Sequence, residues 1–516
     1  MRILSLQTVL SGLSSLSTLG NSTTPVVVTK SAGTFVGEAN TTTSIDAFLG
    51  IPFAQPPVGP LRFKAPVAVP ATTGTYHATS FGNACPQPLG YPAGAPLSED
   101  CLYLNIFRPA GTNVSSALPV LAWIYGGAYT TGSASLPSYS DPTPIIQRSI
   151  ELGKPIMFAA MNYRVNTFGF LASRYVPSED LNAGLQDQRL ALEWLQDNIA
   201  SFGGDPTKVT IWGQSAGGGS VEAHILFPAN RTLFRAGIAD SSTGPFKSSP
   251  YPHQYDEPGK PYARLTSMVG CPLDSTSFAC LQRIPFEIQQ TLMNVSNSLI
   301  EDTLNGQLWQ PAVGPPGSLL PERQSARIAS GAFARVPYLA GTNNNEGTRL
   351  SVDVYNRTHD PADEDALFDD FVGRLILDKT TLSAETLATI RALYPANGTN
   401  NGAPFQTGDS LFDRAEAWYG DNMYLAPRLA HGSELKLLFG RYGVPSSHAE
   451  FATNFTDAYI NFVHDMDPGP SWPRYTADSK LVLQWTKDNI TAIDDDWDLE
   501  RTGFLNSPRV LDEFEK

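Results

Sequence analysis

The stretch VTIWGQSAGGGSVEAHI, residues 209–225, changes from one kind of secondary structure to another within a few residues. Its first part, VTIW, is short, β-branched and apolar, which predicts a buried strand, whereas SVEAHIL carries apolar residues at helical spacing. Between the two lie only small residues, Gln214 and one serine, Ser215, in the pattern Gly-x-Ser-x-Gly. The sequence therefore predicts a strand, a very tight turn bearing Ser215, and a helix.

Such a turn can expose a nucleophile. Gly213 and Gly217 are needed because neighbouring chains pass too close for a side chain and because the backbone of the serine is strained. The strain lifts the hydroxyl of Ser215 clear of the sheet, beside the helix N-terminus, where the N–H of Ala216 is free to stabilise an oxyanion. Placed between strand and helix, the motif predicts a nucleophilic serine. A glycine-rich turn without a catalytic role is the alternative.

The neighbouring segments indicate the fold class. LYLNIFRPA, LPVLAWIYGG and IMFAAMNYR are strand-like, and LQDQRLALEWLQDNIASF is a strongly amphipathic helix that ends at the glycines of FGGDP. Strands that alternate with helices predict an α/β fold whose sheet is mostly parallel in its centre.

Composition limits the classes of partner. The chain has 516 residues, of which 41% are hydrophobic and 16% charged, as in ordinary globular proteins. A formal charge of −15 argues against nucleic acid as a partner, because phosphate binding needs a basic surface. No internal stretch approaches the roughly 18 apolar residues of a membrane helix, so we expect no integral membrane segment.

The N-terminus has the outline of a secretory signal. Residues 1–20 contain one early cation and a Leu-rich stretch that ends in small residues. The alternative is a disordered N-terminus of a cytosolic protein. A secreted chain could carry N-glycans at its Asn-x-Ser/Thr triplets. These begin at Asn21, Asn40, Asn113, Asn230, Asn294, Asn356, Asn397, Asn454 and Asn489.

The four cysteines form two local pairs, Cys85 with Cys101 and Cys271 with Cys280. Four cysteines allow three pairings, but two short loops suit a secreted chain with no thiol left over. Free buried thiols in a cytosolic protein are the alternative. CxxC spacing is absent, so no zinc site is predicted.

A second oxyanion donor is predicted in WIYGGAY, residues 123–129. This segment leaves a strand and enters a glycine turn, so the amides of Gly127 and Ala128 can point into a cavity. Each such donor is worth about 3 kcal/mol in an ester-hydrolysis transition state. A strand-ending turn without this role is the alternative.

A serine of normal pKa also needs a base and a carboxylate that orients the base. Of the seven histidines, His431 and His448 lie in loops late in the chain. Glu346 follows a short apolar strand in VPYLAGTNNNEGT and is a candidate acid. A loop glutamate is otherwise a solvated surface charge. The residues alone leave the choice of base open.

The chain resembles the type-B carboxylesterase/lipase family, which includes cholinesterases and secreted fungal lipases. The matching stretches are FLGIPFAQPPVGPLRF, SEDCLYLNIFRP, NYRVNTFGFL, LNAGLQDQRLALEWLQDNIASFGGDP, GQSAGG and GTNNNEGT. The resemblance implies an α/β-hydrolase fold, in which a large, mostly parallel mixed sheet carries helices on both faces. It also implies one catalytic domain over residues 21–516, with no metal or organic cofactor.

The resemblance further implies a catalytic triad of Ser215, Glu346 and His431. The family's histidine precedes a glycine, an acidic residue and an apolar strand, a pattern that HGSELKLLF fits. His448, in SSHAEF, remains the second choice for the base.

Other family features are structural. Arg62 and Glu99 resemble the family's buried ion pair, and Cys85 with Cys101 resembles its first disulfide. Ser241 stands where the family has a serine that supports the triad carboxylate, although the next family glycine is a serine here.

Two departures concern the pocket. Ala128 replaces the usual third glycine of the oxyanion turn and adds a methyl group there. The loop between Cys85 and Cys101 is much shorter than the amphipathic lid of the family's large fungal lipases, which argues against activation at an oil–water interface.

The implied function is that of a secreted serine carboxylesterase that cleaves small to medium esters through an acyl-enzyme on Ser215. The N–H groups of Gly127, Ala128 and Ala216 would form its oxyanion hole. A triacylglycerol lipase and a catalytically silent binding protein on the same fold are the alternatives.

Overall fold

The computed structural model describes most of the chain. The described residues are 24–88, 92–136, 140–242, 246, 248–285, 308–358, 360–396, 403, 406–425, 449–486, 489–496 and 498–516. The expected signal at residues 1–20 and both candidate bases, His431 and His448, lie outside them.

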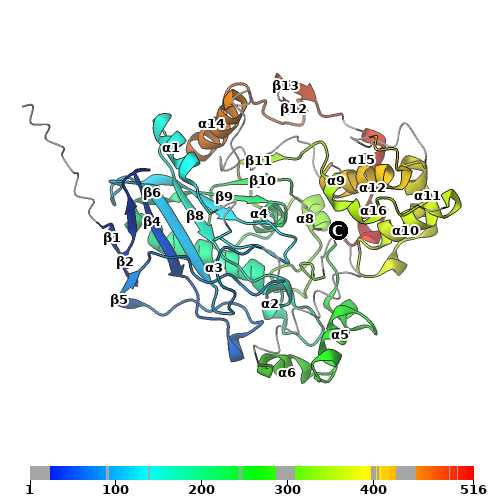
Figure 1. Cartoon of the computed structure of the whole chain (residues 1–516), viewed down its shortest axis with the longest axis horizontal. Coiled ribbons are helices and arrows are strands. Elements are labelled where there is room, and N and C mark those ends of the chain that lie inside the picture. Colours follow the sequence, from blue (N-terminus) through cyan, green and yellow to red (C-terminus); the bar gives the residue numbers. More distant parts are fainter. Residues whose placement is uncertain are drawn as a thin grey trace, which may run out of the picture.

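An eight-stranded mixed sheet forms the left half of the view in Figure 1. Its order is β11 (Tyr338–Gly341), β10 (Ala236–Asp240), β9 (Gly204–Gln214), β7 (Leu118–Ile124), β8 (Met157–Met161), β6 (Tyr103–Pro109), β4 (Ile45–Pro52) and β3 (Glu38–Asn40). The pairs from β11 to β8 are parallel, and those from β8 to β3 are antiparallel. The predicted fold class is confirmed.

Every residue of β8 and β10 is buried, because helices cover both faces of the sheet's centre. The helices α3 (Ala183–Asn198) and α4 (Ala216–Leu226) contact β9, and α4 also contacts β7 and β10. The helices α1 (Thr143–Glu151) and α14 (Ala449–Asp465) lie side by side and contact β6 and β7, respectively (Figure 1).

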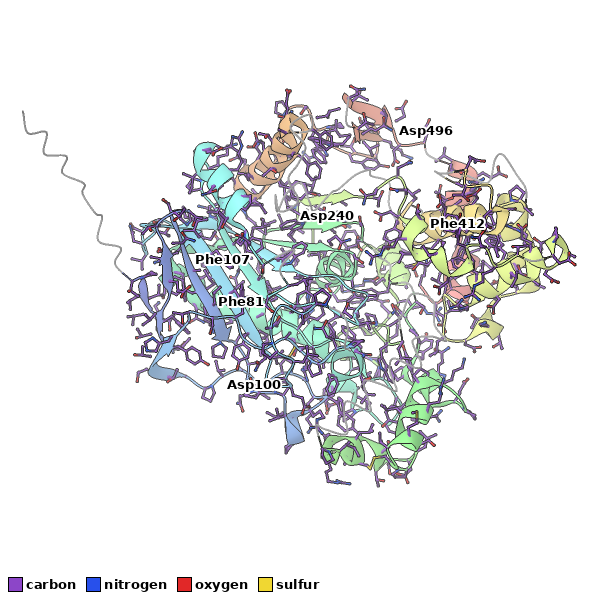
Figure 2. The ribbon with its side chains drawn as sticks, in the orientation of Figure 1. Phe81, Asp100, Phe107, Asp240, Phe412 and Asp496 are labelled. Carbon is purple, nitrogen blue, oxygen red and sulfur yellow. A yellow bond between two sulfur atoms is a disulfide. The ribbon has the colours of Figure 1, made fainter. Side chains whose placement is uncertain are left out.

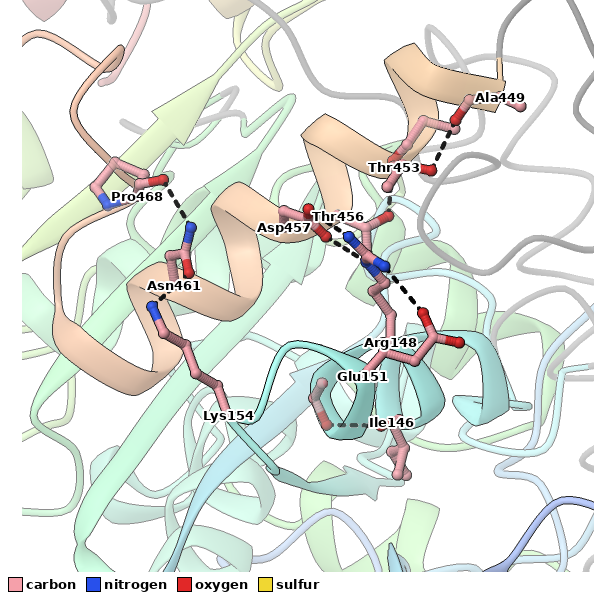
Figure 3. Close-up of polar contacts among 12 residues, drawn as sticks. Ile146, Arg148, Glu151, Lys154, Ala449, Thr453, Thr456, Asp457, Asn461 and Pro468 are labelled. Carbon is pink, nitrogen blue, oxygen red and sulfur yellow. Dashed lines mark hydrogen bonds and ion pairs between the residues drawn. The ribbon is translucent and has the colours of Figure 1, made fainter.

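Figure 3 shows the polar contacts that join α1 to α14 across the sequence. Arg148 forms a bidentate ion pair with Asp457, with Nε–Oδ1 and Nη2–Oδ2 distances of 2.6 and 2.8 Å. Lys154 Nζ donates to Asn461 Oδ1 at 2.7 Å. Bidentate arginine–carboxylate pairs fix the relative orientation of the two side chains and also stabilise the contact. They therefore hold α14 against the N-terminal half of the sheet.

A second hydrophobic cluster is formed by helices at the right of Figure 1. These are α10 (Glu364–Gly373), α11 (Ala384–Leu393), α12 (Ser410–Gly420), α15 (Leu499–Leu505) and α16 (Pro508–Glu513). Phe368, Trp418 and Phe514 are fully buried in this cluster. It supports α9 (Gly347–Leu350), which follows Glu346, because α9 packs directly on α12.

The remaining elements are smaller. They are β1 (Val26–Val28), β2 (Ala32–Val36), β5 (Thr72–His77), α2 (Asn166–Phe170), α5 (Pro261–Met268), α6 (Ser277–Arg283), α8 (Gln324–Ser330), β12 (Leu481–Thr486) and β13 (Asn489–Asp494). Within the described ranges no helix is both long and apolar enough to cross a membrane.

The predicted covalent links are present. Cys85 is bonded to Cys101 and Cys271 to Cys280, with Cα–Cα distances of 5.0 and 5.8 Å. Each bond closes a short loop, as the spacing of the cysteines suggested.

Arg62 and Glu99 form the expected buried ion pair. Arg62 Nε and Nη2 lie 2.5 and 2.8 Å from the two carboxylate oxygens of Glu99. Arg62 Nη1 also donates to the carbonyls of Gln282 and Ile284, at the end of α6. The pair therefore ties the N-terminal segment, the disulfide loop that contains Glu99, and the α6 region into one buried unit.

We predict that Glu99→Ala destabilises the protein by about 3–5 kcal/mol, because it leaves the Arg62 charge buried without its partner. The matched control is Asp197→Ala, which breaks the exposed Arg231–Asp197 pair at 2.9 Å and should cost at most about 1 kcal/mol. Urea unfolding of both variants measures the difference. Equal losses would show that burial of the Arg62–Glu99 pair does not matter.

Candidate active site

Ser215 stands between the last residue of β9 and the first of α4, with φ 56° and ψ −124°. A positive φ at a non-glycine residue costs on the order of 1–3 kcal/mol and persists only when its surroundings impose it. Here the N–H of Ser215 donates to the Asp240 carbonyl at 2.9 Å, and its own carbonyl accepts from the N–H of Gly219 at 2.9 Å. The strained serine is thus held by the neighbouring strand and by its own helix.

The two glycines of the motif leave room for this turn. A Cβ atom on Gly213 would lie 2.2 Å from the Gly217 carbonyl oxygen, and one on Gly217 would lie 2.1 Å from that of Ile124. No side chain fits at such distances. The close approach that the sequence suggested is therefore real, and it packs the start of α4 onto β7.

The turn at Gly127–Tyr129, where the sequence predicts oxyanion donors, has a left-handed backbone over three successive residues. The φ angles of Gly127, Ala128 and Tyr129 are 117°, 58° and 58°. The Gly127 carbonyl accepts from the N–H of Thr131 at 3.0 Å, and the Tyr129 carbonyl accepts from the N–H of Asn166 at 2.6 Å. These bonds fix the turn from both sides.

This turn lies against the serine. A Cβ atom built on Gly126 would be 3.0 Å from the Cβ of Ser215 and 2.4 Å from the Gln214 carbonyl oxygen. Ala216, the remaining predicted donor, is the first residue of α4 and is buried. The structure therefore places Gly126, the residue before Gly127, against Ser215, and Ala216 directly after the serine at the start of α4.

Glu346 lies immediately before α9 and is partly buried. Its Oε1 accepts from the backbone N–H of Asn343 at 2.8 Å and from Asn343 Nδ2 at 3.2 Å. The next residue, Gly347, packs so closely on α12 that a Cβ there would lie 1.9 Å from the Glu416 carbonyl oxygen. The position of the carboxylate is thus fixed by the loop before it and by the helix beneath it.

Ser241 is linked to Glu346 through the side chain of Asn343. Asn343 Nδ2 donates to Ser241 Oγ at 3.1 Å and also contacts Glu346, so the asparagine connects the two side chains. The N–H of Ser241 donates to the Gly341 carbonyl at 2.7 Å, which keeps the ends of β10 and β11 together. Asn343 was not singled out from the sequence.

A buried carboxylate beneath the serine also escaped the sequence analysis. Asp240, labelled near the centre of Figure 2, is 1% exposed and is the last residue of β10. Its two oxygens accept from Trp212 Nε1 and from the Tyr459 hydroxyl, each at 2.6 Å. Asp240 therefore joins β9, β10 and α14 next to the turn that carries Ser215.

A buried polar chain supports the start of α4 from α3. His224 Nε2 lies 3.0 Å from Gln188 Oε1, and Gln188 Nε2 donates to Ser220 Oγ at 3.0 Å. Ser220 Oγ in turn donates to the Ala216 carbonyl at 2.9 Å. Burial lowers the pKa of His224 to about 3, so its imidazole is neutral in neutral solution. Gln188 Oε1 can only accept a hydrogen bond, so the proton of the neutral imidazole lies on Nε2 and is donated to Gln188.

The fold and the turn around Ser215 define the α/β-hydrolase class. The comparisons with known proteins then identify the family. Residues 23–410 match the sequence profile of the carboxylesterase family, and the chain belongs to that family. Membership supports its assignment as a carboxylic ester hydrolase.

Several fungal proteins are similar over most of their length. "Lipase 4" of Diutina rugosa is 34% identical over 495 residues, which cover 84% of this chain and 87% of the relative. "Secreted lipase 1" of Botryotinia fuckeliana is 32% identical over 532 residues, covering 89% and 88%. The crystal structure of Aspergillus niger EstA superimposes with a TM-score of 0.79 and 25% identity, covering 96% of this chain and 99% of that one.

We predict that Ala128→Gly broadens the pocket, because it removes a methyl group from the oxyanion turn. The free energy of unfolding should change by less than about 1 kcal/mol, since glycine adopts a φ of 58° without strain. The ratio of kcat/KM for p-nitrophenyl pivalate to that for the acetate should rise by about 10-fold. An unchanged ratio would mean that the methyl group does not face the acyl chain.

We predict that His224→Gln flattens the pH dependence of stability. Because the folded-state pKa is about 3 and the unfolded value about 6.5, the neutral histidine stabilises the fold fully above pH 6.5 and loses this effect as the pH falls. Between pH 6 and 4 the wild type should lose about 1.4 kcal/mol per pH unit more than the variant. Urea unfolding across this range measures it.

His253→Gln, at an exposed histidine, is the control for this measurement and should keep the wild-type slope. If His224→Gln also kept that slope, the histidine would not be held neutral in the folded protein.

Proposed function

We propose that the protein is a secreted serine carboxylesterase that hydrolyses small to medium esters in solution. In this proposal residues 1–20 are a signal and residues 21–516 form one catalytic domain. Ser215 is the nucleophile, His431 the base, and Glu346 the carboxylate that orients the base. The backbone at Ser215 supports the assignment, because a strained serine between strand and helix exposes its hydroxyl to a substrate.

The reaction would proceed through an acyl-enzyme. Ser215 Oγ, deprotonated by His431, attacks the ester carbonyl carbon, and the N–H groups of Gly127, Ala128 and Ala216 stabilise the resulting oxyanion. The alcohol leaves with the proton from His431. Water then attacks the acyl carbon in the same way and releases the acid, which restores the serine.

The observation that favours an esterase over an interfacially activated lipase is the anchoring of the loop between Cys85 and Cys101. Gln87 is fully buried and forms two hydrogen bonds with one residue, Gly132. Its Nε2 donates to the Gly132 carbonyl at 3.0 Å, and its Oε1 accepts from the Gly132 N–H at 2.9 Å.

Other contacts hold the far part of the same loop. Ser135 Oγ donates to the Ala93 carbonyl at 2.9 Å, and the N–H of Ala84 donates to the Pro96 carbonyl at 2.9 Å. Opening this loop would leave buried polar groups unpaired, at about 1–3 kcal/mol for each group. A lid must swing away at an oil surface, whereas this loop is bonded to the segment that follows the oxyanion turn.

A triacylglycerol lipase is the second candidate, since "Lipase 4" and "Secreted lipase 1" bear that name. Secretion likewise has its support in the name of the second relative and in the expected signal. N-glycans on exposed triplets, such as those of Asn40 and Asn113, would accompany secretion.

The test is hydrolysis of p-nitrophenyl acetate, butyrate, caprylate and palmitate by wild type and Ser215→Ala, below and above the solubility limit of each ester. We expect saturation in solution with short chains and a loss of roughly 10⁴-fold or more in kcat for Ser215→Ala. Ser330→Ala, a surface serine on α8, is the matched control and should keep full activity.

Each other outcome has a meaning. Activity that rises sharply only when droplets form would replace the esterase with the lipase. Equal activity in wild type and Ser215→Ala would show that Ser215 is not the nucleophile. Inactivity of both proteins toward all four esters would favour a catalytically silent binding protein.

A further inference from the structure

One polar side chain beside the proposed nucleophile has no part in the reaction described above. Over residues 209–221 every residue is buried except Gln214 and Ser215, which are partly exposed. On the neighbouring segment, residues 121–130 are buried except for residues 126–128, which are also partly exposed. Each segment therefore reaches solvent only at its turn.

Gly126 brings these two exposed turns together. A Cβ atom on Gly126 would lie 3.0 Å from Ser215 Cβ and 3.2 Å from Gln214 Oε1, so this residue packs against both side chains at once. Because the exposed parts of both segments meet at this point, the amide of Gln214 and the hydroxyl of Ser215 share one opening. An ester bound at Ser215 must therefore lie close to the Gln214 amide.

The Gln214 amide can still bind a substrate. Its Nε2 donates no hydrogen bond within the described ranges, and this atom is not sealed from solvent. Gln87 and Gln188 differ, because each uses both amide atoms in hydrogen bonds with protein groups. An apolar substrate that covered Gln214 Nε2 would leave this donor unpaired, which is unfavourable, whereas a substrate with an acceptor oxygen would pair with it.

We propose that Gln214 determines specificity for esters that carry a neutral acceptor oxygen, in an ether, hydroxyl or carbonyl group, a few bonds from the ester. Gln214 Nε2 would donate to this oxygen while Ser215 attacks the ester carbonyl, so a second polar contact orients the substrate. The group should be neutral, because a charged group would leave water without meeting an opposite charge on the amide. This inference rests on the proposed function, since it concerns the substrate of the same site.

Two pairs of esters with nearly equal shape test the proposal by pH-stat titration. Ethyl methoxyacetate differs from ethyl butyrate, and 2-methoxyethyl butyrate from butyl butyrate, by one ether oxygen in place of a methylene group. The measured quantity is the ratio of kcat/KM for the ether to kcat/KM for the alkyl ester, in wild type and in Gln214→Met. Differences in intrinsic reactivity cancel when the two proteins are compared.

We expect Gln214→Met to lower this ratio by about 3- to 10-fold in at least one pair, because it removes one hydrogen bond between neutral groups. The pair that responds shows whether the oxygen lies on the acyl or the alcohol side. Gln147→Met on α1 is the matched control, because Gln147 is also partly exposed but its Nε2 already donates to the Thr43 carbonyl at 3.2 Å. It should keep both wild-type ratios.

Unchanged ratios for both pairs in Gln214→Met would overturn the proposal. If Gln214→Met does not fold, Gln214→Glu takes its place. A carboxylate cannot donate a hydrogen bond, so the ratio should fall in this variant as well, and ratios equal to those of the wild type would overturn the proposal.

Ser215→Ala separates this inference from the proposed function. Cleavage that Ser215→Ala abolishes, with ratios that Gln214→Met leaves unchanged, would refute the role of Gln214 and keep the esterase. Failure of the wild type to cleave any of the four esters would refute the esterase, and the role of Gln214 with it.

Discussion

The positive φ of Ser215 is the constraint on which the rest of the site depends. A side chain at Gly213 or Gly217 would collide with backbone oxygens about 2 Å away, so this turn can exist only where β7, β9 and α4 pack at their closest. The hydrogen bond from the Ser215 N–H to the Asp240 carbonyl offsets the backbone strain. The Asp240 carboxylate in turn accepts hydrogen bonds from Trp212 and Tyr459. The backbone geometry of Ser215 thus depends on the sheet and on α14 together.

The segment after β7 has two tasks at once. Its left-handed residues present the proposed oxyanion donors, while Gly132, a few residues later, anchors the disulfide loop through Gln87. Movement of that loop would therefore break the hydrogen bonds between Gln87 and Gly132, which lies close in sequence to the proposed oxyanion donors. Such coupling suits an enzyme whose site is formed before the substrate arrives, since preorganised donors stabilise charge without reorganisation.

Local patterns in the sequence predicted the parts of the site that depend on neighbouring residues. The Gly-x-Ser-x-Gly turn, the apolar strands and the two cysteine pairs fall into this group, because periodicity and spacing report directly on them. Asp240 and Tyr459 do not, since they are 219 residues apart and meet only in the fold. The role of Asn343 between Ser241 and Glu346 likewise depends on the pairing of β10 with β11, which no local pattern specifies.

The central claim is that Ser215 forms the covalent intermediate. Treatment with a p-nitrophenyl dialkyl phosphate, followed by peptide mass mapping, tests it most directly, because a nucleophilic serine displaces p-nitrophenolate and retains the phosphoryl group. The account predicts one adduct per chain, on the peptide that contains residues 209–225, with complete loss of esterase activity. An adduct on another residue, or full activity after Ser215 has been modified, would contradict it.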